Sequence, residues 1–179
     1  MNLYITRISE TSAGVKAGSK AAYELLAYAF LTEYDEDLPE IKKTPNGKPY
    51  FPERPDIYFS LSHTKTHVLC VLSGFPVGAD VESPRVISPR AVKFFCSAVE
   101  EALFDPLDLW VLKESYVKLI GGRLPSIKLL RFSRCNGQII APDATVASKL
   151  YRIDGCTAAV CSHGDSPPES IELITSSYD

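Results

Sequence analysis

The chain has 179 residues, of which 45% are hydrophobic and 23% are charged, so it can bury the core of one domain or of two small fused units. Its 13 prolines and 10 glycines follow no period, which excludes collagen-like and low-complexity architectures. The net charge of −3 argues against wholesale nucleic-acid binding, which depends on many phosphate contacts. We therefore expect any anion site to be local.

Neither a membrane span nor an export signal is expected. The sequence has no apolar run of the roughly 18 to 20 residues that cross a bilayer, and it does not begin with a basic region followed by an apolar stretch. The five cysteines are odd in number and lie mostly among apolar neighbours, which is typical of buried thiols in a reducing compartment. These features predict a cytoplasmic protein without membrane contact.

The beginning of the chain predicts a strand followed by a helix. Alternating apolar residues indicate a strand over residues 1–8. Apolar residues at helical spacing then indicate a helix that begins at Ser19, whose hydroxyl would cap it, and that ends by Tyr34. The acidic stretch 33–40 is expected to be an exposed connection.

A turn and three strands are expected next. Residues 44–49 contain two prolines and an Asn-Gly pair, which demand a turn. The last two of the three strands are separated by Ser73 and Gly74 and are predicted to form a hairpin. The predicted strands cover residues 57–61, 66–72 and 76–81.

Prolines within residues 83–90 mark a boundary between two parts of the chain. Beyond them, apolar spacing predicts one helix over 92–103 and, after the break at Pro106, a second and largely buried helix over 107–120. Both parts have a helix followed by strands, and this weak internal similarity does not amount to a sequence repeat. The short strands expected in the remainder cover 128–132, 137–140 and 157–161.

Two acids of the predicted strand 76–81 and its continuation could bind a cation. The period of two places Asp80 and Glu82 on one face of the strand, opposite the apolar side chains. Two carboxylates repel each other unless a positive charge neutralises them, and hard oxygen ligands of this kind suit Mg²⁺. The alternative is an edge strand that exposes two ordinary acids to solvent.

The helix over 107–120 carries a third acid. Glu114 and Lys118 stand four residues apart, so a surface ion pair worth roughly 0.3 to 0.5 kcal/mol would explain them. The helix is so apolar, however, that most of it must be buried, and Glu114 is then poorly hydrated. A desolvated carboxylate either has a positively charged or hydrogen-bonding partner or becomes protonated. A metal ion shared with Asp80 and Glu82 would supply that partner.

The segment Phe59–His63 carries adjacent polar groups. Ser62 and His63 do not predict a hydrolase dyad, because neighbouring strand side chains point to opposite faces and the G-x-S-x-G elbow is absent. Their hydroxyl and imidazole, together with the amides of the following turn, are better suited to binding an anion.

The order of these motifs resembles that of the Sfp-type 4′-phosphopantetheinyl transferases. The resemblance covers roughly residues 20–124, and the closing stretch 151–163 is similar to the last strand of that family. The motifs that carry it are Gly47–Pro49, Phe59–His63, Gly78–Glu82, Phe94–Phe95, Trp110–Ser115 and Lys118.

The resemblance implies a fold and an activity. It implies an α+β monomer of two similar α/β halves related by a pseudo-twofold axis, residues 1–85 and 86–179, each with a helix on a small, mainly antiparallel sheet. Coenzyme A would bind between the halves. Its phosphopantetheine arm would pass to a serine of an apo acyl or peptidyl carrier protein, with release of 3′,5′-ADP.

The resemblance also implies residue roles. Metal ligands for Mg²⁺ would be Asp80, Glu82 and Glu114, and Lys118 would approach the pyrophosphate. With Asp80, Glu114 and Lys118 as the catalytic groups, the serine proton would pass to a carboxylate, for which Glu114 is the candidate, or to water on the metal. The nucleotide end of coenzyme A, chiefly its 3′-phosphate, would contact Lys48, Pro49, Ser62, His63 and Lys20.

A basic stretch suits the expected partner. Residues 111–134 contain six basic side chains and one acid in a chain that is acidic overall, so they could steer an acidic carrier protein, or they could simply form a solvated face. The six basic residues are Lys113, Lys118, Arg123, Lys128, Arg131 and Arg134.

The same three acids leave two other functions open. One is a metal-dependent phosphoester hydrolase, and the other is a module that binds coenzyme A or a carrier without catalysing a reaction.

Overall fold

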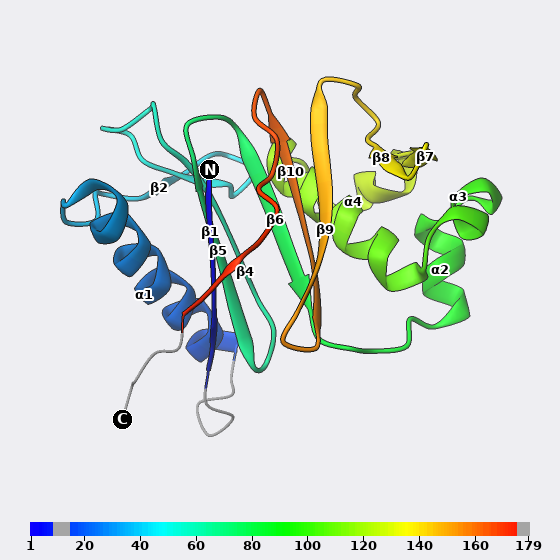
Figure 1. The fold of residues 1–179 in the computed structure, drawn as a ribbon, viewed down its shortest axis with the longest axis horizontal. Helices are drawn as coiled ribbons and strands as arrows, with labels where there is room; N and C mark the ends of the chain where they lie inside the picture. Colours follow the sequence, from blue (N-terminus) through cyan, green and yellow to red (C-terminus); the bar gives the residue numbers. More distant parts are fainter. Residues whose placement is uncertain (9–14, 175–179) are drawn as a thin grey trace.

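The computed structural model describes residues 1–8 and 15–174 and has a mixed α+β fold built around two sheets (Figure 1). The first sheet has the strand order β11-β1-β5-β4 and is antiparallel except where β11 runs parallel to β1. Helix α1 (Val15–Tyr34) covers this sheet. The strands are β1 (Asn2–Arg7), β4 (Tyr58–His63), β5 (His67–Ser73) and β11 (Glu172–Ile174).

The second sheet is antiparallel, with the strand order β6-β10-β9, and helix α4 (Pro106–Ile120) covers it. Strand β6 precedes the proline-rich boundary yet lies in this sheet, while β11 returns to the first one. Its strands are β6 (Val77–Glu82), β9 (Val146–Ile153) and β10 (Cys156–His163); two small hairpins are formed by β2 (Lys42–Lys43) with β3 (Pro49–Tyr50) and by β7 (Ser133–Cys135) with β8 (Gln138–Ile140).

Alternation along the strands divides the core into layers. In β1 and β5, Tyr4 and Cys70 pack under α1, while Leu3 and Leu69 point the other way. These second faces share an apolar cluster with the second sheet, whose opposite face lies under α4. The layers therefore follow the order α1, first sheet, second sheet, α4. None of the helices in the described ranges is long and apolar enough to cross a membrane.

The predicted helix of the first part is confirmed, but its predicted start is wrong. Helix α1 begins at Val15, so Ser19 lies inside it and cannot be its cap. Gly18 allows the helix to run close to β4, because a Cβ there would come within 2.7 Å of Nδ1 of His63. This contact places Ser19 near the end of β4 rather than at the beginning of a helix.

The predicted hairpin through Ser73 and Gly74 is also wrong. Strand β5 pairs with β1 and β4, whereas β6 pairs with β10, so the two strands on either side of that turn lie in different sheets. The hairpin of this region joins β4 to β5 instead. The reason is that β6 finds its backbone partner about eighty residues later, a pairing that no local pattern reveals.

Serine side chains join the two sheets where β4 and β6 lie side by side. The hydroxyl of Ser60 accepts a hydrogen bond from the N–H of Ala79 at 2.9 Å, and that of Ser62 accepts one from the N–H of Val81 at 3.3 Å. Side chains thus replace a backbone ladder along this edge of β6. We call this contact the β4–β6 seam.

Helix α4 lies directly on β6 because residue 78 has no side chain. A Cβ at Gly78 would come within 2.1 Å of the carbonyl oxygen of Ser115 and 2.2 Å of the amide nitrogen of Leu119. Those are backbone atoms, which cannot turn away as a side chain would. The strand face that carries Asp80 and Glu82 is therefore held against α4 rather than exposed to solvent.

Two predictions for the second part are wrong. The helix expected over 92–103 is two helices, because Ser97 begins a new one with a capping box to Glu100. The strand expected over 128–132 is a 3₁₀ helix and an irregular stretch. The elements are α2 (Pro89–Phe95), α3 (Ala98–Leu103) and the 3₁₀ helix η2 (Leu124–Leu129).

A buried ion pair holds these short helices against α4. The ammonium of Lys113 lies 2.8 Å from a carboxylate oxygen of Glu100, and both side chains are at most 1% exposed. Lys113 also donates to the carbonyls of Phe95 and Leu130, while Glu100 accepts from the N–H of Phe132. Each charge therefore has several hydrogen-bond partners, which is what makes its burial tolerable.

We expect Glu100→Ala to destabilise the protein by about 3 to 5 kcal/mol, because it leaves the ammonium of Lys113 buried without its counter-charge. Thermal and urea unfolding measure the loss. Glu101→Ala, which changes an exposed acid on the next residue of α3, is the matched control and should stay within about 0.5 kcal/mol of wild type. Equal effects of the two substitutions would contradict the buried pair.

We expect Gly78→Ala to destabilise the fold by about 3 kcal/mol or more, because the added methyl group would push α4 away from β6. Gly74→Ala is the control, since a Cβ at Gly74 meets no atom within 4 Å. Urea unfolding of both variants checks the difference. A Gly78→Ala protein as stable as Gly74→Ala would show that the helix does not depend on this contact.

Candidate functional site

The contact of β6 with α4 brings acids from both elements together. Asp80 is 5% exposed, and its Oδ1 accepts hydrogen bonds from Ser62 at 2.8 Å and from the ammonium of Lys118 at 2.7 Å. Its Oδ2 is buried and has no hydrogen-bond partner among the described residues. Asp80 therefore keeps one free acceptor in a place where water is scarce.

Glu114 lies on α4 close to these groups. Burial, together with the negative charges of Asp80 and Glu82, raises the pKa of Glu114 to about 7, although Lys118 opposes the shift. A carboxyl group with this pKa exists in both protonation states near neutral pH. It can accept or release a proton there, or bind a cation that removes the repulsion.

Glu82 stands at the outer end of the acid cluster. Arg85 forms two hydrogen bonds to its carboxylate, at 2.8 and 3.2 Å, and the indole N–H of Trp110 donates to it at 3.1 Å. The guanidinium of Arg85 also lies over the Trp110 ring. This acid is thus positioned by partners from the loop after β6 and from α4.

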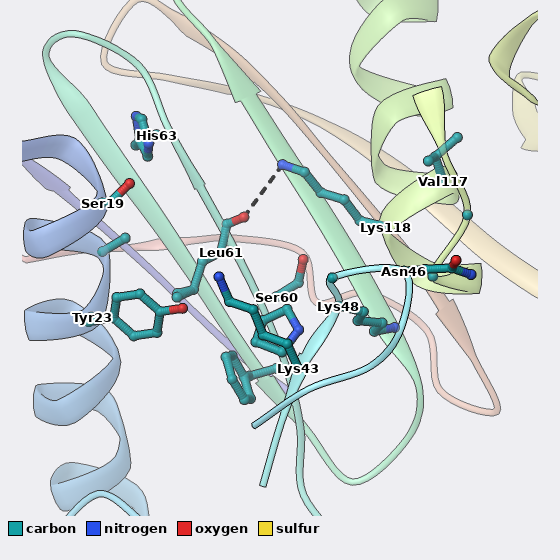
Figure 2. A pocket seen from close by; sticks show the side chains of 16 residues that line it. Ser19, Tyr23, Lys43, Asn46, Lys48, Ser60, Leu61, His63, Val117 and Lys118 are labelled. Atoms are coloured by element: carbon teal, nitrogen blue, oxygen red, sulfur yellow. Dashed lines mark hydrogen bonds between the residues drawn. The ribbon is translucent and has the colours of Figure 1, made fainter. Parts of the chain in front are cut away.

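A cavity of about 340 Å³ lies next to the acids, where α1, the β2–β3 hairpin, β4 and α4 meet. Figure 2 shows side chains from all four of these elements converging on it. Lys118 belongs both to this cavity and to the acid cluster. Among its lining residues are Ser19, Tyr23, Lys43, Asn46, Lys48, Pro49, Ser60, His63 and Lys118.

The predicted site residues are thus only partly brought to the cavity. Lys48, Pro49, His63 and Lys118 line it. Lys20 does not belong to the described lining; it is exposed on α1, and its ammonium lies 3.3 Å from Glu24.

Two motif residues make contacts other than the predicted ones. The ammonium of Lys48 donates to the carbonyls of Leu119 at 2.6 Å and Val77 at 3.3 Å, and burial lowers its pKa to about 8. Ser62 is 8% exposed and uses its hydroxyl on Asp80 and on the backbone of β6. The single donor of Ser62 is therefore used on Asp80, and two of the three donors of the Lys48 ammonium are used on backbone carbonyls.

Sequence reasoning missed four lining residues on elements from which it had named others. Ser19 and Tyr23 stand four residues apart on α1, on the side of the helix that faces the cavity, and Lys43 and Asn46 come from the hairpin (Figure 2). Ser19 and Tyr23 could have been identified from the sequence because they lie next to the core residue Ala22, on the helix face that is otherwise apolar.

The predicted basic surface needs one correction. Lys113 is completely buried with Glu100 and contributes nothing to a surface charge. Arg123, Lys128, Arg131 and Arg134 are exposed. The local positive surface is therefore smaller than the sequence count indicated, because one of its charges is neutralised inside the core.

The acids as they stand are paired with cationic side chains. Within residues 1–8 and 15–174, no three His, Cys, Asp or Glu side chains are arranged to hold a metal ion. Asp80 pairs with Lys118, and Glu82 pairs with Arg85. Two observations nevertheless fit a divalent cation at this place: the free, buried Oδ2 of Asp80 and the raised pKa of Glu114.

An acid cluster beside a cavity lined by lysines and hydroxyl groups is suited to a phosphorylated ligand. Comparison with curated proteins agrees. The chain is 33% identical over 147 residues to the 4′-phosphopantetheinyl transferase Sfp of Bacillus subtilis (strain 168), a match that covers 72% of this chain. It is 29% identical over 158 residues to the 4′-phosphopantetheinyl transferase AcpT of Escherichia coli O157:H7, covering 77% of this chain and 73% of AcpT.

These matches support the Sfp-type 4′-phosphopantetheinyl transferases as the family that this chain resembles. A further relative, the 4′-phosphopantetheinyl transferase ffp of Bacillus subtilis, is 29% identical over 146 residues. The matches to Sfp and to ffp each cover 65% of those proteins' own length. No protein-family model matches the chain.

The raised pKa of Glu114 predicts a pH-dependent effect of Glu114→Gln in metal-free buffer. Between the ordinary pKa of 4.5 and about 7, the folded protein binds the Glu114 proton more tightly than the unfolded chain does, so rising pH lowers the stability of wild type. Glutamine does not titrate and escapes this loss. The variant should therefore gain up to roughly 3 kcal/mol over wild type at pH 8 relative to their difference at pH 4.

Urea unfolding at the two pH values measures this gain. Glu53→Gln, which changes an exposed acid, is the control and should show the same difference from wild type at both pH values. A Glu114→Gln difference that does not change between pH 4 and pH 8 would mean that Glu114 has an ordinary pKa.

Proposed function

We propose that this protein transfers the 4′-phosphopantetheine arm of coenzyme A to a serine of an apo acyl or peptidyl carrier protein and releases 3′,5′-ADP. Similarity to proteins named as 4′-phosphopantetheinyl transferases supports this activity. The observation that carries the proposal is the position of Lys118, whose ammonium lies 2.7 Å from Asp80 and whose side chain lines the cavity. The side chain of Lys118 thus lies both in the cavity and at the acid cluster.

The cavity supports binding of the nucleotide part of coenzyme A. Its lysines and hydroxyl groups are suited to phosphate oxygens, and the rings of Tyr23 and His63 offer flat surfaces. We place the pyrophosphate near Lys118, since that side chain leads from the cavity to the acids. His63 and Lys43 are the candidates on the described lining for the 3′-phosphate, while Lys20 could contribute after leaving Glu24.

The transfer exchanges one P–O bond for another. The serine oxygen of the carrier bonds to the phosphorus that bears the pantetheine arm, and the bond from that phosphorus to the bridging oxygen breaks. The serine proton passes to the carboxylate of Glu114, which acts as the general base. Lys118 stabilises the negative charge that develops on the leaving 3′,5′-ADP.

Asp80, Glu82 and Glu114 would hold Mg²⁺, as the free Oδ2 of Asp80 and the mutual repulsion of the acids indicate. When bound, the ion supplies further neutralisation of the pyrophosphate charge. Ser62 keeps Asp80 oriented by its hydrogen bond at 2.8 Å, and Arg85 and Trp110 orient Glu82. The chain's own side chains therefore prepare the acids for a shared cation.

The remaining expectations concern the carrier and the form of the protein. The exposed basic residues Arg123, Lys128, Arg131 and Arg134 support docking of an acidic carrier protein. One helix on each sheet supports two similar halves, although β6 of residues 1–85 pairs in the second sheet and β11 of residues 86–179 pairs in the first. We propose that the protein acts as a monomer. All five cysteines are free, which supports action in the reducing cytoplasm.

The test is incubation of the purified protein with coenzyme A, Mg²⁺ and a panel of apo carrier proteins, followed by intact-mass measurement. We expect one carrier to gain the mass of a single phosphopantetheine arm. Asp80→Asn and Glu114→Gln should abolish the gain, with Glu53→Gln as the matched surface control. Cleavage of coenzyme A without a carrier would indicate a hydrolase, and binding of coenzyme A without any turnover would indicate a non-catalytic module.

A further inference from the structure

The turn that precedes β3 holds Lys48 in a fixed place. The N–H of Thr44 donates to the carbonyl of Lys48 at 2.9 Å, and the N–H of Lys48 donates back to the hydroxyl of Thr44 at 3.1 Å. Gly47, at a φ of +90°, supplies the left-handed conformation that the turn requires. The backbone of Lys48 is thus bonded on both sides within the hairpin.

From this turn the Lys48 side chain reaches across to the two elements that carry the acids. Its ammonium donates to the carbonyl of Leu119 on α4 at 2.6 Å and to the carbonyl of Val77 on β6 at 3.3 Å. Its methylene groups pass close to Gly121, where a Cβ would lie 3.6 Å from Cδ of Lys48. One side chain therefore touches the hairpin, the strand and the helix.

Both carbonyls need a donor that the backbone does not provide. The last carbonyls of a helix lack an N–H from the next turn. In α4 the N–H groups of Gly121 and Gly122 serve the carbonyls of Lys118 and Val117, and the ammonium of Lys48 serves that of Leu119. A positive charge at this end of a helix is also favoured by the helix dipole.

The carbonyl of Val77 lies on the β4–β6 seam. Along an antiparallel strand, the N–H and C=O groups of every second residue point to the same edge, so those of Val77, Ala79 and Val81 share one edge. The hydroxyl groups of Ser60 and Ser62 accept from Ala79 and Val81, and Lys48 donates to Val77. Three side chains thus bind backbone groups on the edge of β6 that has no backbone ladder to its neighbour β4.

We propose that Lys48 is a positioning residue that clamps β6 and α4 together and so fixes Asp80 relative to Glu114 and Lys118, rather than a ligand of the 3′-phosphate. This inference rests on the proposed function and replaces the role that motif resemblance implied for this lysine. One carbonyl belongs to Val77, the residue before Gly78, and the other to Leu119, whose amide nitrogen would lie 2.2 Å from a Cβ at Gly78. The clamp therefore acts directly where the acids are brought together.

The test compares Lys48→Met with wild type, because methionine keeps most of the side-chain length and loses every donor. Rates are measured with coenzyme A and with 3′-dephospho-coenzyme A, and amide hydrogen exchange is followed at Gly121 and Gly122. In folded Lys48→Met we expect kcat to fall by about 10- to 100-fold, since small misplacements of reacting groups have effects of this size. We expect exchange of the two amides to speed up about tenfold.

The preference for coenzyme A over its 3′-dephospho analogue distinguishes the two roles. A clamp leaves this preference unchanged, whereas a phosphate ligand would lose it when substituted. Lys48→Arg keeps a charged donor and should restore part of kcat. Lys42→Met is the matched control on the same hairpin, because the ammonium of Lys42 is half-exposed and pairs with Glu40 at 3.3 Å; it should change neither kcat nor exchange.

Two results would overturn the clamp: loss of the preference at an unchanged kcat, or unchanged kcat and exchange together. If Lys48→Met does not fold, Lys48→Arg is tested by the same measurements of substrate preference and amide exchange. A reduced kcat with an unchanged preference for coenzyme A over its 3′-dephospho analogue would then support the clamp. If wild type transfers no arm to any carrier, the proposed function fails, and hydrogen exchange at Gly121 and Gly122 alone decides on the clamp.

Discussion

The close contact between α4 and β6 at Gly78 is the constraint on which the site depends. Because a Cβ there would come within 2.1 Å of the backbone of α4, helix and strand are nearer than side chains normally allow. This nearness lets the charge of Asp80 on β6 raise the pKa of Glu114 on α4. A wider helix-to-sheet distance would leave two separate, ordinary acids.

The contact creates an electrostatic problem that the neighbouring groups solve only in part. Lys118 and Ser62 satisfy one oxygen of Asp80, and Arg85 and Trp110 satisfy Glu82, but the second oxygen of Asp80 has no partner in the described part of the chain. Glu114 responds by a raised pKa. By contrast, the buried pair of Lys113 and Glu100 has several partners for each charge. Within residues 1–8 and 15–174, the buried side-chain N or O atom without a hydrogen-bond partner thus lies in the acid cluster, where a ligand or cation would supply one.

Sequence patterns predicted what depends on neighbouring residues. The period of two correctly separated Asp80 from the apolar side chains of β6, and the apolar circumference of α4 correctly indicated that Glu114 has little water. The predictions that were wrong concern contacts between residues that are distant in sequence. The Ser73-Gly74 turn looks like a hairpin, but β6 pairs with β10, and Lys113 looks like a surface charge, but it meets Glu100 inside the core. Neither partner can be identified from residue types and spacing alone.

Motif residues at this site also form hydrogen bonds to backbone groups, because one edge of β6 has no backbone ladder to a neighbouring strand. A strand edge without a neighbouring strand has backbone groups that must find other partners when it is buried. Here those partners are side chains of Lys48, Ser60 and Ser62, two of which a ligand-based reading assigns to a nucleotide. Polar residues beside a cavity therefore do not all face it. Where two sheets meet without a ladder between them, a polar motif on the adjoining strand and turn is what keeps the acidic strand in register with its helix.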